Sequence, residues 1–344
     1  MKILVTGGAG YIGSHTVLAL LENGHQVVVV DNLVNSSAKS LERVEKLTAK
    51  KVTSYFFDLS DANQLNQVFA DHQIDGVIHF AGLKAVGESV TTPLRYYANN
   101  IGSTLSLCMV MEANDVKQLV FSSSATVYGD PAIVPIPETA ALQATNPYGQ
   151  TKLMIEQILR DLAATNTGWQ ISLLRYFNPI GAHQSGLIGE DPNGPPSNLL
   201  PYVAQVAVGK REKLMVHGND YPTPDGTGVR DYVHVVDLAQ GHLAALNSAA
   251  PLNQCQAYNL GTGQGYSVLE VIKAFESAAK KPVPYEVGPR RPGDIASCYA
   301  DVTKAHQGLH WQAEKTLAQA CQDAWRWQSQ NPDGYRKTAI LGDI

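Results

Sequence analysis

Strand-like and helix-like segments alternate over the first half of this chain, and the alternation predicts an α/β fold with a doubly wound parallel sheet. Several strand-like runs are short, rich in β-branched residues and nearly all apolar, as strands buried inside a parallel sheet are. Ligands of such sheets bind at the carboxyl ends of the strands. The predicted strands are residues 3–6, 27–31, 53–58, 76–80, 118–122 and 170–175.

The predicted helices between these strands have recognisable ends. The helix-like segment 12–23 is followed by Gly24, a glycine of the kind that often follows the last turn of a helix. Asp61 is a candidate N-cap residue for a helix that runs to His72. These end signals support the strand–helix alternation.

The pattern changes after about Arg175. Residues 178–201 are rich in Gly, Pro, Asn and Ser, which predicts a long functional loop. We therefore expect a Rossmann-type domain over residues 1–176 and a smaller mixed α/β domain over residues 177–344 that caps the carboxyl edge of the sheet. Some segments of the second domain are expected to return to the sheet, and the chain from about Gln330 is expected to be loosely held.

The composition restricts the class of function. Of the 344 residues, 44% are apolar and 17% are charged, which fits a soluble globular protein. A net charge of −5 argues against a surface for nucleic acid or for an anionic membrane. No apolar run approaches the roughly 18 residues of a membrane span. We therefore expect no nucleic acid and no membrane among the partners.

The cysteines and histidines indicate no metal site. The four cysteines are widely spread and the ten histidines lack metal-binding spacing, so neither a disulfide framework nor a bound metal is expected. His79 ends an apolar strand and is expected to be a hydrogen-bonded core residue. The chain opens on a strand with no signal peptide. Together these features predict small-molecule chemistry in a reducing cytoplasm.

A glycine-rich turn follows the first predicted strand. The stretch contains Gly8-x-Gly10-x-x-Gly13 with Gly7 before it, and it can equally be read from Gly7. Because it follows a strand and opens a helix, it predicts a dinucleotide site in which the backbone approaches a pyrophosphate. Asp31 ends the next strand, where a carboxylate accepts from a ribose 2′-OH and repels a 2′-phosphate. The predicted cofactor is NAD rather than NADP.

Two more strand ends carry candidate cofactor contacts. Asp58 follows the third strand and is placed to meet the adenine edge, although a plain helix cap is the alternative interpretation. The segment Phe80-Ala81-Gly82-Leu83-Lys84 follows the fourth strand, at the edge where ligands bind. Lys84 is therefore a candidate cofactor contact, with a solvated surface lysine as the alternative.

Tyr148 and Lys152 are candidate catalytic residues. Residues four apart share one face of a helix, and Ser124 lies upstream at the end of a run of three serines. Half-ionising a tyrosine near pH 7 requires a pKa shift of about 3 units, or about 4 kcal/mol. Lys152 and a positively charged nicotinamide ring together favour that phenolate, which would be a base for alcohol oxidation. Because this spacing also arises by chance, only the surrounding motifs can show whether it indicates a catalytic pair.

The motifs taken together resemble the extended short-chain dehydrogenase/reductase family, and within it the C4 epimerases that act on UDP-glucose and UDP-galactose. The resemblance leaves out residues 330–344. It runs through TGGAGYIGSH, HFAGLKAVGES, SSSATVYGD, NPYGQTK, LRYFNPIGAH, GEDPNG, DGTGVRDYVHVVDLA, YNLGTG and RRPGD.

The resemblance implies roles at the matching positions. The implied catalytic residues are Ser124, Tyr148 and Lys152. The implied NAD contacts are Gly7, Gly10, Tyr11, Ile12, Gly13, Asp31, Asn32, Asp58, Leu59, Phe80, Ala81, Gly82, Lys84, Asn99, Ser122, Tyr148, Lys152 and Phe177. The implied UDP-sugar contacts are Lys84, Ser124, Tyr148, Asn178, Asn198, Leu199, Arg230, Arg291, Asp294 and Cys298.

Some of these positions also carry their own chemical argument. Arg230 and Arg291 suit a pyrophosphate because guanidinium binds phosphate oxygens in a bidentate manner, although surface ion pairing is the alternative. Ser197 departs from the family pattern, which has Asn beside Asn198. Cys298 stands where relatives restricted to glucose and galactose carry Tyr. Our hypothesis is that this smaller residue admits UDP-GlcNAc and UDP-GalNAc, with an inert cysteine as the alternative.

The implied reaction is a reversible C4 epimerisation through a transient 4-keto sugar, with tightly bound NAD taking hydride and returning it. A dehydratase is one alternative, but the relatives that eliminate water carry Asp-Glu where this chain has Ala125-Thr126. A net oxidoreductase that releases NADH is the second alternative. A non-catalytic NAD-binding regulator is the third, and it would have little need for the three catalytic residues together.

The resemblance also implies a homodimer. The expected interface consists of the helices near residues 94–114 and 148–165. Simple packing of these helices on the sheet is the alternative explanation of their apolar faces, and periodicity does not separate the two.

Overall fold

The computed structural model describes residues 1–291 and 293–336. Its largest element is a parallel sheet of seven strands in the order β10-β6-β5-β4-β1-β2-β3. This confirms the predicted fold class and all six predicted strands. The strands are β1 (Lys2–Thr6), β2 (Gln26–Asp31), β3 (Thr53–Phe56), β4 (Gly76–His79), β5 (Gln118–Ser124), β6 (Gln170–Tyr176) and β10 (Gln254–Leu260).

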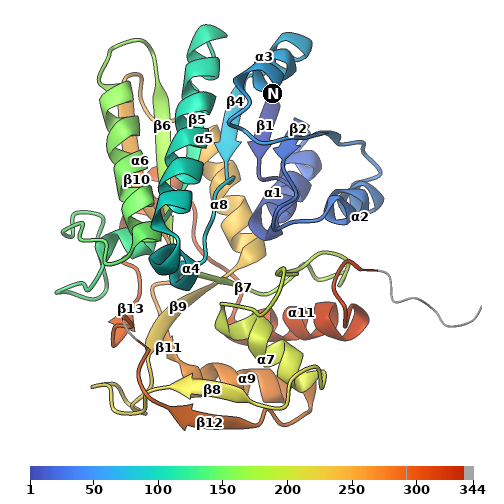
Figure 1. The fold of residues 1–344 in the computed structure, drawn as a ribbon, viewed down its shortest axis with the longest axis vertical. Coiled ribbons are helices and arrows are strands. Elements are labelled where there is room, and N and C mark those ends of the chain that lie inside the picture. The colour runs from blue at the N-terminus through green and yellow to red at the C-terminus, as the bar shows by residue number, and fades with distance from the viewer. Residues whose placement is uncertain (292, 337–344) are drawn as a thin grey trace, which may run out of the picture.

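Helices cover both faces of the sheet (Figure 1). One face packs against α1 (Tyr11–Glu22), α2 (Ala38–Thr48), α8 (Val235–Asn247) and α10 (Thr303–Leu309). The other packs against α3 (Ala62–Asp71), α5 (Pro93–Ala113) and α6 (Pro147–Ala163). The predicted helix ends are confirmed, because Gly24 has a φ of 82° and the Asp61 side chain accepts from the backbone N–H of Gln64 at 3.1 Å.

A smaller unit lies beyond the arrowheads of the sheet strands (Figure 1). It has a four-stranded sheet, a two-stranded sheet and three longer helices around one apolar core. Its elements are β7 (Asn178–Ile180), β8 (Leu214–His217), β9 (Val229–His234), β11 (Gly265–Ser267), β12 (Tyr285–Gly288), β13 (Ser297–Cys298), α7 (Leu199–Ala207), α9 (Val268–Ala279) and α11 (Leu317–Gln330).

The sequence from residue 177 onward contributes to both units. β10 pairs with β6 at the edge of the large sheet, and α8 packs against α1. The stretch 178–201 is not wholly a loop, since β7 forms its start and α7 begins near its end. The two-domain division at residue 177 stays a prediction. His79 is confirmed as a core residue, with its ring nitrogens 2.6 Å from Thr6 Oγ1 and 3.0 Å from Thr104 Oγ1.

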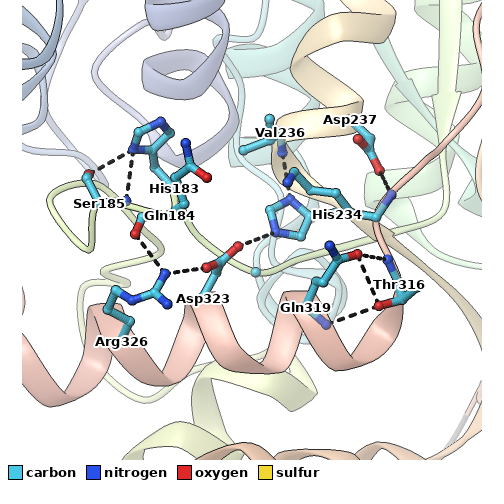
Figure 2. A network of polar contacts seen from close by, with 12 residues as sticks. His183, Gln184, Ser185, His234, Val236, Asp237, Thr316, Gln319, Asp323 and Arg326 are labelled. Carbon is cyan, nitrogen blue, oxygen red and sulfur yellow. Dashed lines mark hydrogen bonds and ion pairs between the residues drawn. The ribbon is translucent and has the colours of Figure 1, made fainter.

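Polar contacts hold α11 against the rest of the smaller unit (Figure 2). The carboxylate of Asp323 lies 3.3 Å from Nε2 of His234 on β9 and accepts from Nη1 of Arg326 at 2.7 Å. The same Nη1 donates to the backbone carbonyl of Gln184 at 2.7 Å. α11 is thereby fixed to β9 and to the segment that follows β7.

The prediction of a loosely held chain from about Gln330 is wrong as far as Tyr335. Arg43 Nη1 donates to Asn331 Oδ1 at 2.8 Å, and the Arg43 guanidinium lies 5.0 Å from the centre of the Tyr335 ring. The backbone N–H of Tyr335 donates to Asp191 Oδ2 at 2.8 Å. Residues 337–344 lie outside the described residues. Among the residues that the structure describes, none of the helices is both long and apolar enough to cross a bilayer.

The glycine-rich turn joins β1 to α1 with very close backbone contacts. Gly7 has a φ of 70°, and a Cβ atom placed on it would lie 2.8 Å from the backbone nitrogen of Ala81. A Cβ atom on Gly13 would lie 2.2 Å from the carbonyl oxygen of Gly7. Only glycine fits at Gly13, because the carbonyl oxygen of Gly7 belongs to backbone that β1 and α1 hold in place.

We expect Gly13→Ala to lower the free energy of unfolding by at least about 2 kcal/mol, because the added methyl group cannot fit without moving the turn. Urea denaturation of the purified variant measures this change. Gly87→Ala in the short helix α4 (Val86–Thr91) is the control, since a Cβ atom there meets no atom within 4 Å. The control should be neutral or slightly more stable. Equal stability of Gly13→Ala and the wild type would contradict the turn geometry.

Candidate active site

The predicted site residues lie at the carboxyl edge of the large sheet. Gly7 follows β1, Asp31 ends β2, Ser124 ends β5 and Phe177 follows β6. The sheet order places β4 beside β1, and the helices after these two strands cover opposite faces. This is the switch point at which doubly wound sheets bind nucleotides. The sheet therefore gathers residues from distant parts of the sequence at one edge.

Asp31 connects β2 to the glycine-rich turn. Its Oδ2 accepts from the backbone N–H of Ala9 at 3.0 Å, and its Oδ1 accepts from Ser36 Oγ at 2.7 Å and from the backbone N–H of Leu33 at 2.8 Å. A carboxylate has about four acceptor positions, so it retains capacity for a ribose hydroxyl. The open turn and this carboxylate together fit a dinucleotide.

Asp58 is held by its own turn at the end of β3. The backbone N–H of Ser60 donates to it at 3.0 Å and lowers the pKa of the Asp58 carboxyl, and the Ser60 hydroxyl donates at 2.7 Å. Asn32 Nδ2 donates to the other oxygen at 2.9 Å. The structure thus brings together two of the predicted NAD contacts, Asn32 and Asp58, side by side.

The segment after β4 depends on Asn100, a buried residue of α5 that the sequence analysis missed. Asn100 Oδ1 accepts from the backbone N–H of Leu83 at 2.7 Å, and its Nδ2 donates to the carbonyl of Leu83 and to Thr151 Oγ1, both at 3.0 Å. Thr151 precedes Lys152 on α6. One amide therefore joins the segment 80–84 to the helix that carries Tyr148 and Lys152, the predicted catalytic pair. Its neighbour Asn99 is a predicted NAD contact.

Other predicted cofactor contacts have defined positions. Tyr11 begins α1, and its hydroxyl donates to the carbonyl of Gly181 at 2.7 Å. Leu59 is buried, and the Phe80 ring lies 4.6 Å from the ring of His242. Gly82 has a φ of 158°, and Asn99 is partly buried on α5.

Lys152 lies buried under the end of β5. Its side chain is 5% exposed, its Nζ donates to the carbonyl of Ser122 at 2.7 Å, and it lies 6.0 Å from the centre of the Tyr148 ring. Burial lowers the pKa of Lys152 to about 8, while the Glu156 carboxylate acts in the opposite direction. The ammonium form therefore still predominates near pH 7. The predicted i, i+4 arrangement of Tyr148 and Lys152 on one helix is present in α6.

Tyr148 is half-buried near Ser124. Burial raises the pKa of the Tyr148 hydroxyl, and a hydrogen bond with the Ser124 hydroxyl acts in the opposite direction. The protein alone thus favours the neutral phenol. The positive charges that would oppose this effect are the ammonium of Lys152 and the ring of a bound oxidised nicotinamide, as predicted.

Glu156 lies four residues after Lys152 on the same face of α6 and was not predicted as a site residue. Its carboxylate accepts from Ser123 Oγ at 2.6 Å, from Arg175 Nε at 2.9 Å and from Arg160 Nη2 at 3.0 Å. Glu156 and Arg175 are fully buried, which requires such complete pairing. The one sequence signal that could have identified Glu156 is its position four residues after Lys152 on the same helix.

The predicted UDP-sugar contacts from the smaller unit partly cluster. Cys298 on β13 pairs with Arg230 on β9 in the backbone register. Asp294 lies 3.9 Å from Arg230 Nη2 and accepts from Arg291 Nε at 3.1 Å. Cys298 also packs against the apolar cluster that contains Phe177. Since that cluster includes Ala125, the smaller unit contacts the turn directly after Ser124.

A further carboxylate, Glu190, joins residues from the two units. Its Oε1 accepts from Asn198 Nδ2 at 3.0 Å and lies 3.4 Å from Lys84 Nζ. The sequence analysis quoted GEDPNG, which contains this residue, but assigned it no role. Asn178 begins β7, and Leu199 begins α7 directly after Asn198.

The chain is similar to characterised proteins over nearly its full length. A model of the NAD dependent epimerase/dehydratase family matches residues 3–261. The UDP-glucose 4-epimerase of Bacillus subtilis (strain 168) is 62% identical over 336 residues, which cover 98% of this chain and 99% of that protein.

Solved structures show the same similarity. UDP-glucose 4-epimerase from Bifidobacterium longum, in complex with NAD+ and UDP, has a TM-score of 0.94 and 56% identity, covering 97% of this chain and 100% of that chain. The UDP-Glc/GlcNAc 4-epimerase from Campylobacter jejuni has a TM-score of 0.82 and 38% identity, covering 96% of this chain and 99% of that chain.

The fold, the site and these similarities agree with one another. The glycine-rich turn and Asp31 lie where a dinucleotide binds, and Tyr148 and Lys152 lie on one helix face beside Ser124. The family model covers the whole of this region. The chain belongs to the NAD-dependent epimerase/dehydratase family.

Proposed function

We propose that the protein catalyses the reversible C4 epimerisation of UDP-glucose and UDP-galactose through a transient 4-keto sugar, with NAD held tightly between turnovers. The observation that carries the proposal is the position of Tyr148 and Lys152 on α6 beside Ser124, next to the smaller unit that supplies Arg230. The similarity to UDP-glucose 4-epimerases over nearly the full chain supports it.

The residues of the large sheet bind the cofactor. The turn from Gly7 to Gly13 receives the pyrophosphate at the N-terminus of α1, where backbone N–H groups point outward. Asp31 accepts from the ribose of the adenosine half, and Lys152 holds the nicotinamide ribose. Bound NAD supplies the hydride acceptor and donor for C4 of the sugar.

Tyr148 is the general base and acid for the sugar 4-OH. As a phenolate it accepts that proton, directly or through Ser124, and it returns the proton when the alcohol forms again. The buried ammonium of Lys152 stabilises the phenolate. Both faces of the keto sugar have to reach the same nicotinamide ring, so the protein binds the sugar mainly through its UDP group.

The smaller unit binds this UDP group. Arg230 and Arg291 supply guanidinium donors for the diphosphate, and Asp294 orients both. Asn178 and Asn198 supply amide groups from the starts of β7 and α7. These two arginines, one aspartate and two asparagines together carry no net negative charge, which suits an anionic substrate.

A dehydratase or a net oxidoreductase is less well supported. Elimination of water needs an additional acid and base, whereas Ala125 is apolar and Thr126 Oγ1 donates to Ser124 Oγ at 3.0 Å. A net oxidoreductase would release NADH, and an absorbance scan during turnover detects it. A non-catalytic regulator would not need Ser124, Tyr148 and Lys152 in one place.

We also propose that the enzyme accepts UDP-GlcNAc and UDP-GalNAc. Cys298 is small, and burial raises the pKa of its thiol to about 11, so it remains a neutral part of the pocket wall. It packs against the apolar cluster that includes Phe177 and Ala125, and Ala125 directly follows Ser124. A residue at this position therefore controls the volume beside the sugar, including its 2-acetamido group.

The proposed assembly is a homodimer formed through α5 and α6. The helices α5 and α6 lie side by side (Figure 1). They expose large apolar side chains, including Leu94, Leu105 and Met109 on one face of α5 and Met154 on α6. Packing on the sheet does not explain them, because they point away from it and remain 37–81% exposed. A second copy of this chain offers the same apolar face in return.

The predicted location in a reducing cytoplasm also remains a proposal. All four cysteines are free thiols in the structure, which suits such a compartment.

We expect Tyr148→Phe to keep NAD bound while turnover of UDP-galactose falls by about 100-fold or more, because the proton acceptor is removed without loss of shape. Absorbance of the released cofactor and chromatography of UDP-glucose measure the two quantities. Tyr285→Phe, an exposed residue of β12, is the control and should retain wild-type turnover. Near-wild activity of Tyr148→Phe would falsify the base assignment.

We expect Cys298→Tyr to lower kcat/KM for UDP-GalNAc by about 100-fold while kcat/KM for UDP-galactose changes by less than about fivefold. The added ring occupies the space of the acetamido group but leaves room for a hydroxyl. Cys298→Ser is the matched control, since it preserves the volume and should keep both activities. The idea is wrong if Cys298→Tyr leaves the ratio of the kcat/KM values for UDP-GalNAc and UDP-galactose unchanged.

We expect the wild type to run at twice the mass of one chain in size-exclusion chromatography with light scattering. The double variant Leu105→Lys/Met109→Lys should shift toward single chains, because four charges would face one another across the interface. Val287→Lys on β12 removes an equally exposed apolar residue elsewhere and should remain a dimer. A wild type that is a single chain at all concentrations would exclude the proposal.

A further inference from the structure

Glu190 lies between the cofactor side and the substrate side of the site. Its side chain is only 10% exposed, and it lies in the irregular segment between β7 and α7. A carboxylate with so little solvent needs partners that offset its loss of water. The identity of those partners indicates what the residue does.

One oxygen of Glu190 contacts both halves of the site. Oε1 accepts from Asn198 Nδ2 at 3.0 Å and lies 3.4 Å from the Nζ of Lys84. Lys84 belongs to the segment after β4, at the cofactor edge, and Asn198 directly precedes α7. Asn198 is the N-cap residue of α7, yet its side chain makes no capping bond to that helix. Its amide is therefore directed to Glu190 instead.

The backbone around Glu190 is held by the C-terminal part of the chain. Trp327 Nε1 donates to the Glu190 carbonyl at 3.1 Å, and a Cβ atom on Gly189 would lie 2.4 Å from Trp327 Cγ. Asp191 Oδ2 accepts from the backbone N–H of Tyr335. Because both neighbours of Glu190 are fixed in this way, the carboxylate has a defined place that does not depend on Lys84, whose side chain is 44% exposed.

The chemistry of a carboxylate limits how its partners are oriented. An ionised carboxylate only accepts hydrogen bonds, so it selects the NH2 end of the Asn198 amide and prevents the flipped arrangement. The second N–H and the Oδ1 of Asn198 then remain available to a ligand. Lys84 keeps two of its three N–H donors free in the same way.

We propose that Glu190 is a positioning residue for the UDP-sugar: it fixes the orientation of Asn198 and Lys84 before substrate binds. The proposal rests on the proposed function, because it assigns Asn198 and Lys84 to the substrate. A ligand that meets groups already in place loses no free energy in ordering them. The effect of Glu190 should therefore appear in the affinity for the UDP-sugar.

The main test is the steady-state kinetics of Glu190→Gln with UDP-galactose. Glutamine keeps the size but loses the negative charge, and its amide can turn either its oxygen or its NH2 group toward Asn198 and Lys84, so their orientation is no longer fixed. We expect KM to rise about tenfold, as for the loss of one hydrogen bond to a charged group, with kcat within about twofold and NAD content unchanged. A merely structural role would lower NAD content and thermal stability and leave KM unchanged, and that result would overturn the proposal.

A mutant cycle tests whether Glu190 acts through these two partners. If it does, Glu190→Gln should raise KM by no more than about twofold in a background that already carries both Asn198→Ala and Lys84→Ala. A full tenfold effect in that background would contradict the proposal. Glu286→Gln is the control, because Glu286 forms an exposed ion pair with Lys213 between β12 and β8 and should leave KM at the wild-type value.

Binding of UDP separates this proposal from the proposed function. Absence of any epimerisation by the wild type would refute the function, whatever Glu190 does. Titration calorimetry with UDP needs no turnover. Glu190→Gln should bind UDP with a dissociation constant about tenfold higher than that of the wild type and of Glu286→Gln. Equal affinity of the three proteins would overturn the positioning role even if the wild type is an active epimerase.

Discussion

The site depends on a cation buried under the end of β5. Lys152 gives up almost all of its solvent, and its charge is offset by the carbonyl of Ser122 and, one helical turn further along α6, by Glu156. Glu156 in turn requires the buried guanidinium of Arg175 on β6. Charges of alternating sign therefore connect the face of α6 that carries Tyr148 and Lys152 to the centre of the sheet. The position of Tyr148 follows from this arrangement, because it lies one turn before Lys152 on the same helix.

Much of the fold could be predicted because its signals are local. The strands are short apolar runs, Gly24 and Asp61 mark helix ends, and the glycine-rich turn identifies β1 and α1. β10 was not among the predicted strands, since its pairing with β6 is a long-range contact that periodicity does not reveal. The same reason explains the mistake about Tyr335, whose partners Arg43 and Asp191 are far away in sequence.

The candidate site divides in the same way. Tyr148, Lys152 and Asp31 have recognisable spacing or context, whereas Asn100 and Glu190 have neither, because their function depends on which segments meet in space. Asn100 holds the segment after β4 against α6, and Glu190 holds it against the start of α7. Residues that join two segments carry no pattern of their own in a single sequence. They become visible only when the fold has placed both segments.

The clamp that Arg43, Trp327 and Tyr335 form on the segment around Glu190 has a consequence for biosynthesis. The ribosome makes the glycine-rich turn and Asp31 well before it makes Trp327 and Tyr335. The edge strand β10 also emerges late. The nucleotide-binding edge thus becomes available to fold long before the segment on its far side is fastened. In a nascent chain the turn and Asp31 would come together first, and recognition of the sugar nucleotide would be completed only after Tyr335 has emerged.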